Sequence, residues 1–191
     1  MKVLFPVVLL CSGLVFSQKT VPAGYQKIPE ILDNPELLYP FIVPDKKYDY
    51  WSVLKNNPDP DKAIIYESQT PDFMTLNDPA PVKGFFQKCL GEDCFSYVLA
   101  CDKGRTLYFS DERQLRNFIG FVDNLPEAIL VANTYGYIVD TGNALSSSYK
   151  IEEKHISLYL TKLTNSKTKE SYLITINRKT GKLEVKNIST Y

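Results

Sequence analysis

The stretch SDERQLRNFIGFVDNLPEAILVANTYG, residues 110–136, decides the fold because it predicts two consecutive helices. Ser110 or Asp111 is placed to cap the first helix, and with Asp111 as the cap Gln114 falls at the partner position of a capping box. The apolar residues that follow have the spacing of one helical face: Leu115, Phe118, Ile119 and Val122. This face has to be buried against a sheet.

The second helix is predicted over residues 125–135. Asn124 and Glu127 repeat the spacing of a capping box, and Pro126 stands in the first turn, where its missing amide costs least. Gly136 is a typical C-terminal cap. Alanines on this helix allow close approach to a sheet.

The segments around the two helices alternate apolar and polar residues, which is typical of strands. Upstream, residues 95–101 and 105–109 predict a hairpin that turns at residues 102–104. Downstream, the expected elements are a short strand at 137–140, a polar loop at 141–148 and a meander of strands near 156–161, 172–177 and 183–185. For residues 84–191 we therefore predict an α+β domain, with two helices packed on an antiparallel sheet of about five strands.

Residues 18–83 form a proline-rich segment that we expect to be an extended, irregular arm across the domain. Prolines remove amide donors and fix a backbone dihedral, so long helices and central strands are disfavoured here. The many large apolar residues of this segment predict that it packs on the domain. Short helices are expected at residues 29–32 and 50–54, and a short strand at residues 63–67.

Residues 1–17 have the pattern of a secretory signal peptide, with Lys2 before an apolar stretch. Cleavage before Gln18 would release a secreted or periplasmic protein. A membrane anchor is disfavoured because the apolar run is shorter than the roughly 20 residues that span a bilayer. Leu10 disfavours lipid attachment at Cys11, and no segment after Ser17 is apolar enough to be transmembrane.

The charge of the mature chain is balanced, because removing Lys2 from 22 basic residues leaves 21 against 22 acidic ones. The strong positive field that nucleic-acid binding uses is missing, so we expect no nucleic-acid partner. Basic residues do become more frequent toward the C-terminus, where we interpret them as a solvated face: Lys167, Lys169, Arg178, Lys179, Lys182 and Lys186.

Three cysteines remain after cleavage. Cys89 and Cys94 enclose a short loop and are the predicted disulfide. Cys101 lies on one face of a predicted strand and is expected to be a buried free thiol. The spacing of the cysteines matches no common zinc site, and the single histidine, His155, lies far along the chain, so no metal is expected.

Tyr48, Tyr50 and Trp51 form an aromatic cluster with two interpretations. Flat amphipathic rings can stack on a carbohydrate or peptide ligand. The same rings also suit an arm that is fixed to a core, and this structural interpretation is favoured.

No catalytic constellation is evident. A Ser or Cys nucleophile needs a base that could only be His155, and nucleotide-binding and hydrolase motifs are absent, so no cofactor is expected. Paired carboxylates remain the alternative for a secreted hydrolase. The acids available are Asp59, Asp61, Glu67, Asp72, Asp78, Glu92, Asp93, Asp111, Glu112, Glu127 and Asp140.

Two short stretches carry a family resemblance. Residues 126–132 read PEAILVA, and residues 172–183 read YLITINRKTGKL. Residues 125–185 thus resemble a PepSY domain, in which a helix with a Glu-Ala pair precedes strands that end in an aspartate-x-x-Thr-Gly-Lys turn. Asn177 stands at the position of that aspartate.

This resemblance implies a secreted, non-enzymatic module that restrains peptidases or binds partners in the cell envelope. The whole chain also resembles small exported proteins of Bacteroidetes-type bacteria, whose signals often end in Ser-Gln, as at Ser17 and Gln18. We therefore expect a non-catalytic binding or inhibitory protein whose partner is an envelope protein or a peptidase.

Overall fold

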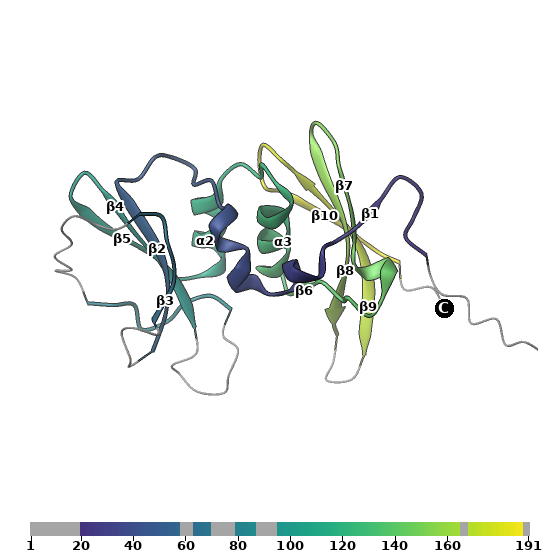
Figure 1. Cartoon of the computed structure of the whole chain (residues 1–191), viewed down its shortest axis with the longest axis horizontal. Helices are drawn as coiled ribbons and strands as arrows, with labels where there is room; N and C mark the ends of the chain where they lie inside the picture. The colour runs from purple at the N-terminus through teal and green to yellow at the C-terminus, as the bar shows by residue number, and fades with distance from the viewer. Residues whose placement is uncertain (1–19, 58–62, 70–78, 87–94, 165–167, 189–191) are drawn as a thin grey trace, which may run out of the picture.

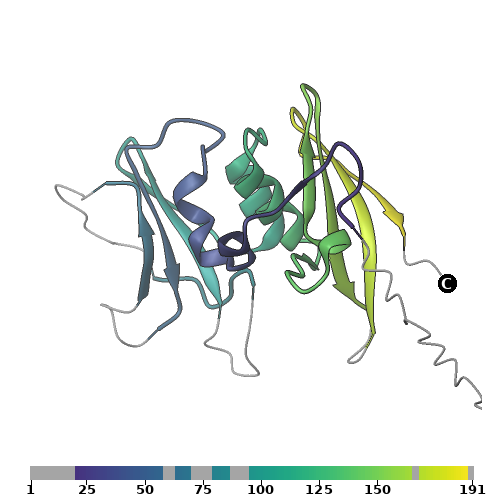
Figure 2. The same ribbon diagram turned by 45° about the vertical axis from the view of Figure 1, so that its right-hand side comes forward.

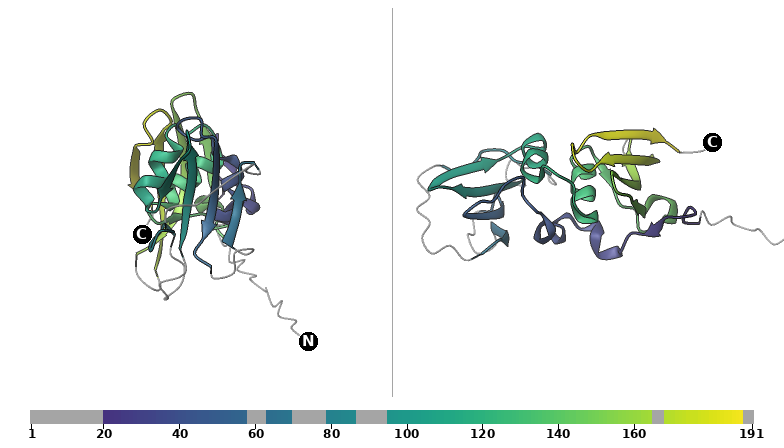
Figure 3. Two further views of the ribbon diagram at one scale, coloured as in Figure 1. Left: turned by 90° about the vertical axis from the view of Figure 1, so that its left-hand side faces the viewer. Right: turned by 90° about the horizontal axis from the view of Figure 1, so that it is seen from above.

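The computed structural model describes residues 20–57, 63–69, 79–86, 95–164 and 168–188. This part of the chain is α+β, with two antiparallel sheets and a layer of helices between them (Figure 1). The view from above in Figure 3 shows the same order of sheet, helices and sheet. The predicted signal peptide and the predicted Cys89–Cys94 disulfide lie outside the described residues. Within those residues, no helix has the length and apolar character needed to cross a membrane.

The first sheet has the strand order β3-β2-β4-β5. Its strands are β2 (Tyr50–Lys55), β3 (Ile64–Glu67), β4 (Ser96–Asp102) and β5 (Arg105–Phe109). The predicted hairpin at β4 and β5 is confirmed, because Asp102 pairs with Arg105 and leaves a two-residue turn. Both turn residues have positive φ, 51° at Lys103 and 74° at Gly104, as in the turn that matches the twist of a hairpin.

The second sheet has the order β1-β7-β8-β9-β10, and β6 also pairs with β8. Its strands are β1 (Gln26–Lys27), β6 (Tyr137–Ile138), β7 (Ser148–Ile151), β8 (His155–Leu163), β9 (Lys169–Asn177) and β10 (Leu183–Asn187). The predicted meander of β8, β9 and β10 is confirmed. Leu158 lies opposite Ile174, and both are buried on the face that turns toward the helices. Residues 144–146 form the short 3-10 helix η4 (Ala144–Ser146) before β7.

Both predicted helices and their N-terminal caps are confirmed in α2 (Glu112–Ile119) and α3 (Leu125–Asn133), whereas α3 ends two residues before its predicted end and has Thr134, not Gly136, as its C-terminal cap. The Asp111 carboxylate accepts a hydrogen bond from the Gln114 amide at 2.8 Å. Asn124 and Glu127 form the capping box of α3. The chain leaves α2 at Gly120, where φ is +65° and a Cβ atom would lie 2.7 Å from the Cβ of Asp45.

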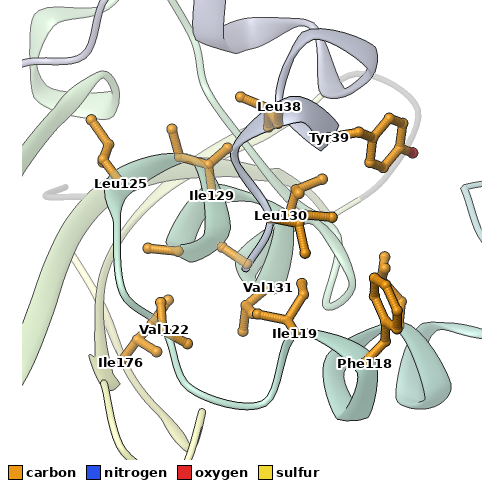
Figure 4. Packing of buried hydrophobic residues seen from close by; sticks show 14 of the residues in the cluster. Leu38, Tyr39, Phe118, Ile119, Val122, Leu125, Ile129, Leu130, Val131 and Ile176 are labelled. Atoms are coloured by element: carbon orange, nitrogen blue, oxygen red, sulfur yellow. The ribbon is translucent and has the colours of Figure 1, made fainter. Parts of the chain in front are cut away.

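The main core lies between the sheets and around α3, of which every residue from Leu125 to Ala132 is buried. A helix that is apolar all round needs partners on every side. The second sheet covers one side, and α2 and the arm cover the other. Figure 4 shows the arm residues Leu38 and Tyr39 in one cluster with Ile129 and Leu130 of α3.

The arm runs across the helix layer from one sheet to the other (Figure 2). It contains the 3-10 helices η1 (Glu30–Asp33), η2 (Pro35–Leu37) and η3 (Tyr39–Phe41), so the short helix expected near residues 29–32 is confirmed. Pro35 and Pro40 stand in the first turns of η2 and η3, where their missing amides are tolerated.

Two expectations about the architecture are wrong. The helices pack between two sheets and not on a single sheet of about five strands. Residues 50–54 form strand β2 and not a short helix, because pairing with β4 and β3 satisfies their backbone groups. The short strand expected at residues 63–67 is confirmed as β3. Residues on both sides of the boundary predicted at Lys83 therefore share one sheet.

Candidate functional site

Three loops meet at one edge of the molecule, which is the upper edge in Figure 1. They are the α2–α3 loop (residues 120–124), the β7–β8 turn (152–154) and the β9–β10 turn (178–182), and together we call them the loop edge. The two turns lie at the same end because alternate connections of a meander do so. Backbone bonds join the three: the Val122 amide donates to the Arg178 carbonyl at 2.8 Å, and the Arg178 amide donates to the Lys154 carbonyl at 3.0 Å.

The side chain of Arg178 fastens the loop edge further. Its Nε donates to the Val122 carbonyl at 3.2 Å and its Nη2 to the Asp123 carbonyl at 2.9 Å. Its Nη1 lies 3.5 Å from the Glu152 carbonyl oxygen. The planar guanidinium presents donors in fixed directions and so can hold several acceptors at once. These acceptors are neutral carbonyls, so none of them neutralises the charge of Arg178.

The side chain of Asn177 stabilises the β9–β10 turn by hydrogen bonds to its backbone. Its Oδ1 accepts hydrogen bonds from the amides of Lys179 and Thr180, each at 3.1 Å. Gly181 then has φ of +63°, a conformation that favours glycine. The first amides of the turn are therefore bonded to the protein itself.

A pocket of about 530 Å³ opens beside this turn. The loop edge supplies most of its wall: Phe121, Asp123, Glu153, Lys154, Asn177, Arg178, Lys179 and Thr180. Phe121 provides an aromatic surface and is 53% exposed, although it is flanked by Gly120 and the fully buried Val122. The pocket thus combines one apolar wall with charged groups of both signs.

A second pocket of about 310 Å³ lies on the other side of the same turn. It is lined by His155, Thr175, Asn177, Thr180, Lys182 and Glu184. Asn177 and Thr180 line both pockets, so the two hollows are neighbours across the turn. His155 is opposite Asn177 in the β8–β9 pairing, which brings the single histidine of the chain to this site.

Glu127 links the loop edge to the arm. Its side chain is fully buried, and Oε1 accepts a hydrogen bond from the Val43 amide at 2.6 Å. Oε2 accepts from the amides of Asp123 at 2.6 Å and Asn124 at 3.3 Å. Burial raises the pKa of this carboxyl to about 7, although the backbone donors oppose the shift. Glu127 therefore fixes the path of the α2–α3 loop from below.

The three aromatic residues that were considered as a ligand site, Tyr48, Tyr50 and Trp51, are not part of the loop edge. Tyr48 and Trp51 belong to the main core, where their rings contact Phe118 at centroid distances of 5.3 and 5.2 Å. Tyr50 lies on the other face of the first sheet, in a second cluster with Tyr97. The three side chains are 6–9% exposed, so they are packed inside the fold and are not gathered on a ligand-facing surface.

Among the residues that the structure describes, the remaining sequence candidates do not converge either. Cys101 is a free, half-buried cysteine in β4, and His155 begins β8 in the other sheet, across the helix layer (Figure 1). Within the described ranges, no group of three His, Cys, Asp or Glu side chains is placed to hold a metal ion.

Several acids named from the sequence have structural partners. Asp140 forms an ion pair with Lys169 at 3.1 Å, and Glu67 accepts a hydrogen bond from the Tyr50 hydroxyl at 2.8 Å. The acids that line the larger pocket are Asp123 and Glu153, which were not among the sequence candidates. The basic residues around Arg178 were interpreted from the sequence as a solvated face, because the site exists only where the three loops meet.

Comparison with known proteins gives no relative, because no protein-family model, curated protein or solved structure matches this chain. The resemblance of residues 125–185 to a PepSY domain therefore stays a prediction. In the structure this segment comprises α3 and the strands β6 to β10, and its Thr-Gly-Lys turn is the β9–β10 turn of the loop edge.

Proposed function

We propose that the protein is an exported, non-catalytic binding protein that holds its partner at the loop edge. The observation that carries this proposal is the pocket of about 530 Å³, in which an exposed aromatic ring is surrounded by charged groups on three fastened loops. Binding sites commonly combine an apolar wall with a few polar groups that fix the orientation of the ligand.

An envelope protein or a peptidase is the partner that we propose. The PepSY resemblance implies this class, and the loop edge suits it because loops held by a rigid frame commonly carry recognition. Arg178, which belongs to the β9–β10 turn, and Glu127 provide the frame, since their side chains bond the backbone of the other two loops and of the arm.

Site-specific crosslinking tests the proposal. A photoreactive phenylalanine analogue is placed at Phe121 in the full chain, and the crosslinked products from intact cells are identified by mass spectrometry. Tyr135 is the matched control, because it is an aromatic residue, 40% exposed, at the opposite end of α3. A partner captured from position 121 and not from position 135 supports the proposal. Identical products from both positions contradict it.

Export is a separate part of the proposal. We expect the mature protein in the periplasmic or extracellular fraction to begin at Gln18, which is measured by intact mass and N-terminal peptide identification. A cytosolic protein that retains residues 1–17 contradicts it.

A secreted hydrolase is the second candidate, because Asp123 and Glu153 line one pocket from two different loops. Glycoside hydrolysis uses two carboxyl groups on either side of the bond that is cleaved. Turnover of chromogenic glycosides that is lost in both Asp123→Asn and Glu153→Gln, and kept in Glu112→Gln, would favour this candidate. No turnover by the wild-type protein removes it.

A further inference from the structure

The cations of the loop edge are gathered around one turn. Some lysines outside the loop edge pair with acids, as Lys27 does with Glu30 and Lys169 with Asp140. Among the described residues, no acid pairs with the ammonium groups of Lys154, Lys179 or Lys182. With Arg178, whose donors go to carbonyl oxygens, four cations with no acid partner surround one turn.

The backbone of the turn disfavours a small anion such as phosphate. Compact anions are usually held by successive free amides of a turn. Here the amides of Lys179 and Thr180 donate to Asn177, the Gly181 amide donates to the Asn177 carbonyl at 2.8 Å, and the Lys182 amide lies 3.4 Å from the Thr180 hydroxyl oxygen. The charges of the side chains are thus the main attraction that the turn offers to an anion.

The acids of the site disfavour a dense polyanion such as a nucleic acid or a sulfated glycan. Asp123 and Glu153 line the larger pocket and Glu184 the smaller one, so a chain of closely spaced anionic groups meets repulsion on both sides of the turn. A peptide suits this pattern better, because its amides can donate to these carboxylates while its acidic side chains reach the lysines.

Phe121 adds an apolar requirement. Its ring is 53% exposed in the wall of the larger pocket, within reach of a side chain that enters from outside. Aromatic residues at the centre of an interface often contribute much of the binding energy, and charged residues around them set orientation and the rate of association.

We infer that the loop edge binds an acidic peptide segment with an apolar side chain. The carboxylates of the peptide pair with Lys154, Lys179 and Lys182 across the two pockets, and the apolar side chain rests on Phe121. This inference rests on the proposed function and specifies which part of the partner is recognised.

The test uses a fluorescein-labelled peptide in which glutamates are separated by serines around one central phenylalanine, and binding is measured by fluorescence anisotropy with the full mature chain. The charge-reversal variant is Lys154→Glu, Lys179→Glu and Lys182→Glu. The matched control reverses Lys83, Lys103 and Lys186, which lie outside the loop edge, and so has the same net charge. Urea unfolding of both variants shows that each is folded.

We expect the charge-reversal variant to bind about tenfold more weakly, equal to about 1.4 kcal/mol, and the control to stay within about twofold of the wild type. Phe121→Ala is expected to weaken binding as well, and raised salt to weaken only the lysine-dependent part. A phenylalanine-free glutamate peptide, inorganic phosphate and heparin are the competitor probes. Equal competition by heparin or phosphate overturns the inference.

Two outcomes separate this inference from the proposed function. If the acidic peptide does not bind, or binds equally to both triple variants, the inference is overturned, while crosslinking from position 121 still supports a binding function. If crosslinking from position 121 captures no specific partner, the proposed function is overturned, whatever the peptide does.

Discussion

At the scale of single residues, Arg178 and Glu127 do most to organise the loop edge, and both act on backbone atoms. Arg178 donates to carbonyls of the α2–α3 loop and the β7–β8 turn. Glu127 accepts from amides of the arm and of the α2–α3 loop. The loop therefore lies between a donor on one side and an acceptor on the other.

Replacing Arg178 tests the first of these contacts. We expect Arg178→Ala to lower the free energy of unfolding by about 2 kcal/mol, because charged hydrogen bonds to several carbonyls are lost. Arg178→Lys should recover only a small part of this free energy, since an ammonium group lacks the planar set of donors that a guanidinium has. Urea unfolding gives the two values. Equal stability of Arg178→Lys and wild type would contradict the role assigned to the guanidinium.

The pKa of Glu127 predicts a pH dependence. Its value of about 7 in the folded protein lies above the ordinary value of a glutamate, about 4.3 in an unfolded chain. Between these two values the folded protein binds a proton that the unfolded chain releases. The free energy of unfolding should therefore fall as pH rises from about 4.3 to 7. Above about pH 7 Glu127 should cause no further change in this free energy. The neighbouring Asp123 carboxylate acts in the same direction.

Urea unfolding at several pH values measures this slope. Glu127→Gln should remove it, whereas Glu153→Gln, at an exposed position, should leave it unchanged. The same slope in wild type and Glu127→Gln would show that another group is responsible.

At the scale of elements, the helix caps were the most reliable sequence signals. Asp111 and Asn124 both accept the expected backbone bond, because capping depends on residues only three positions apart. The β4–β5 turn was predictable for the same reason, since Asp102 and Gly104 are typical turn residues and Gly104 adopts a positive φ readily. Local chemistry fixed these elements.

The secondary structure of the arm could not be predicted from the local sequence alone. Strand β2 contains Tyr50, Trp51 and Val53, which favour a strand, but only pairing with β4 decides between a strand and a short helix. The loop edge is similar, because Phe121, Glu153 and Arg178 come from three separate loops. Their meeting depends on the topology of the second sheet and on the path between α2 and α3.

Substitutions of Asn124 allow the contributions of the helix cap and of the contact with the arm to the free energy of unfolding to be measured separately. Its Oδ1 accepts from the Glu127 amide at 2.9 Å, and its Nδ2 donates to the Phe41 carbonyl at 2.9 Å. Asn124→Ala should lose both contacts, and a cap alone contributes about 1 kcal/mol. Asn124→Asp keeps the cap and loses only the bond to the arm. Its free energy of unfolding should therefore lie between those of the wild type and Asn124→Ala. An aspartate variant as unstable as the alanine variant would contradict this division.

At the scale of the whole molecule, one core cluster contains residues of both sheets, both helices and the arm. Such continuity predicts a single cooperative unfolding transition. Trp51, the one tryptophan, reports on the first sheet, and hydrogen exchange of β8 and β9 reports on the second. We expect the two signals to change at the same urea concentration. Two separate midpoints would show that the sheets fold independently.

The way in which Arg178 holds the loop edge has a consequence for protein engineering. Its acceptors are main-chain oxygens, which are present whatever side chain a residue carries. Positions 121, 153 and 154 can therefore be randomised in a display library while the guanidinium of Arg178 holds the loop backbones in the same relative positions. The fold would then serve as a scaffold from which binders of new specificity are selected.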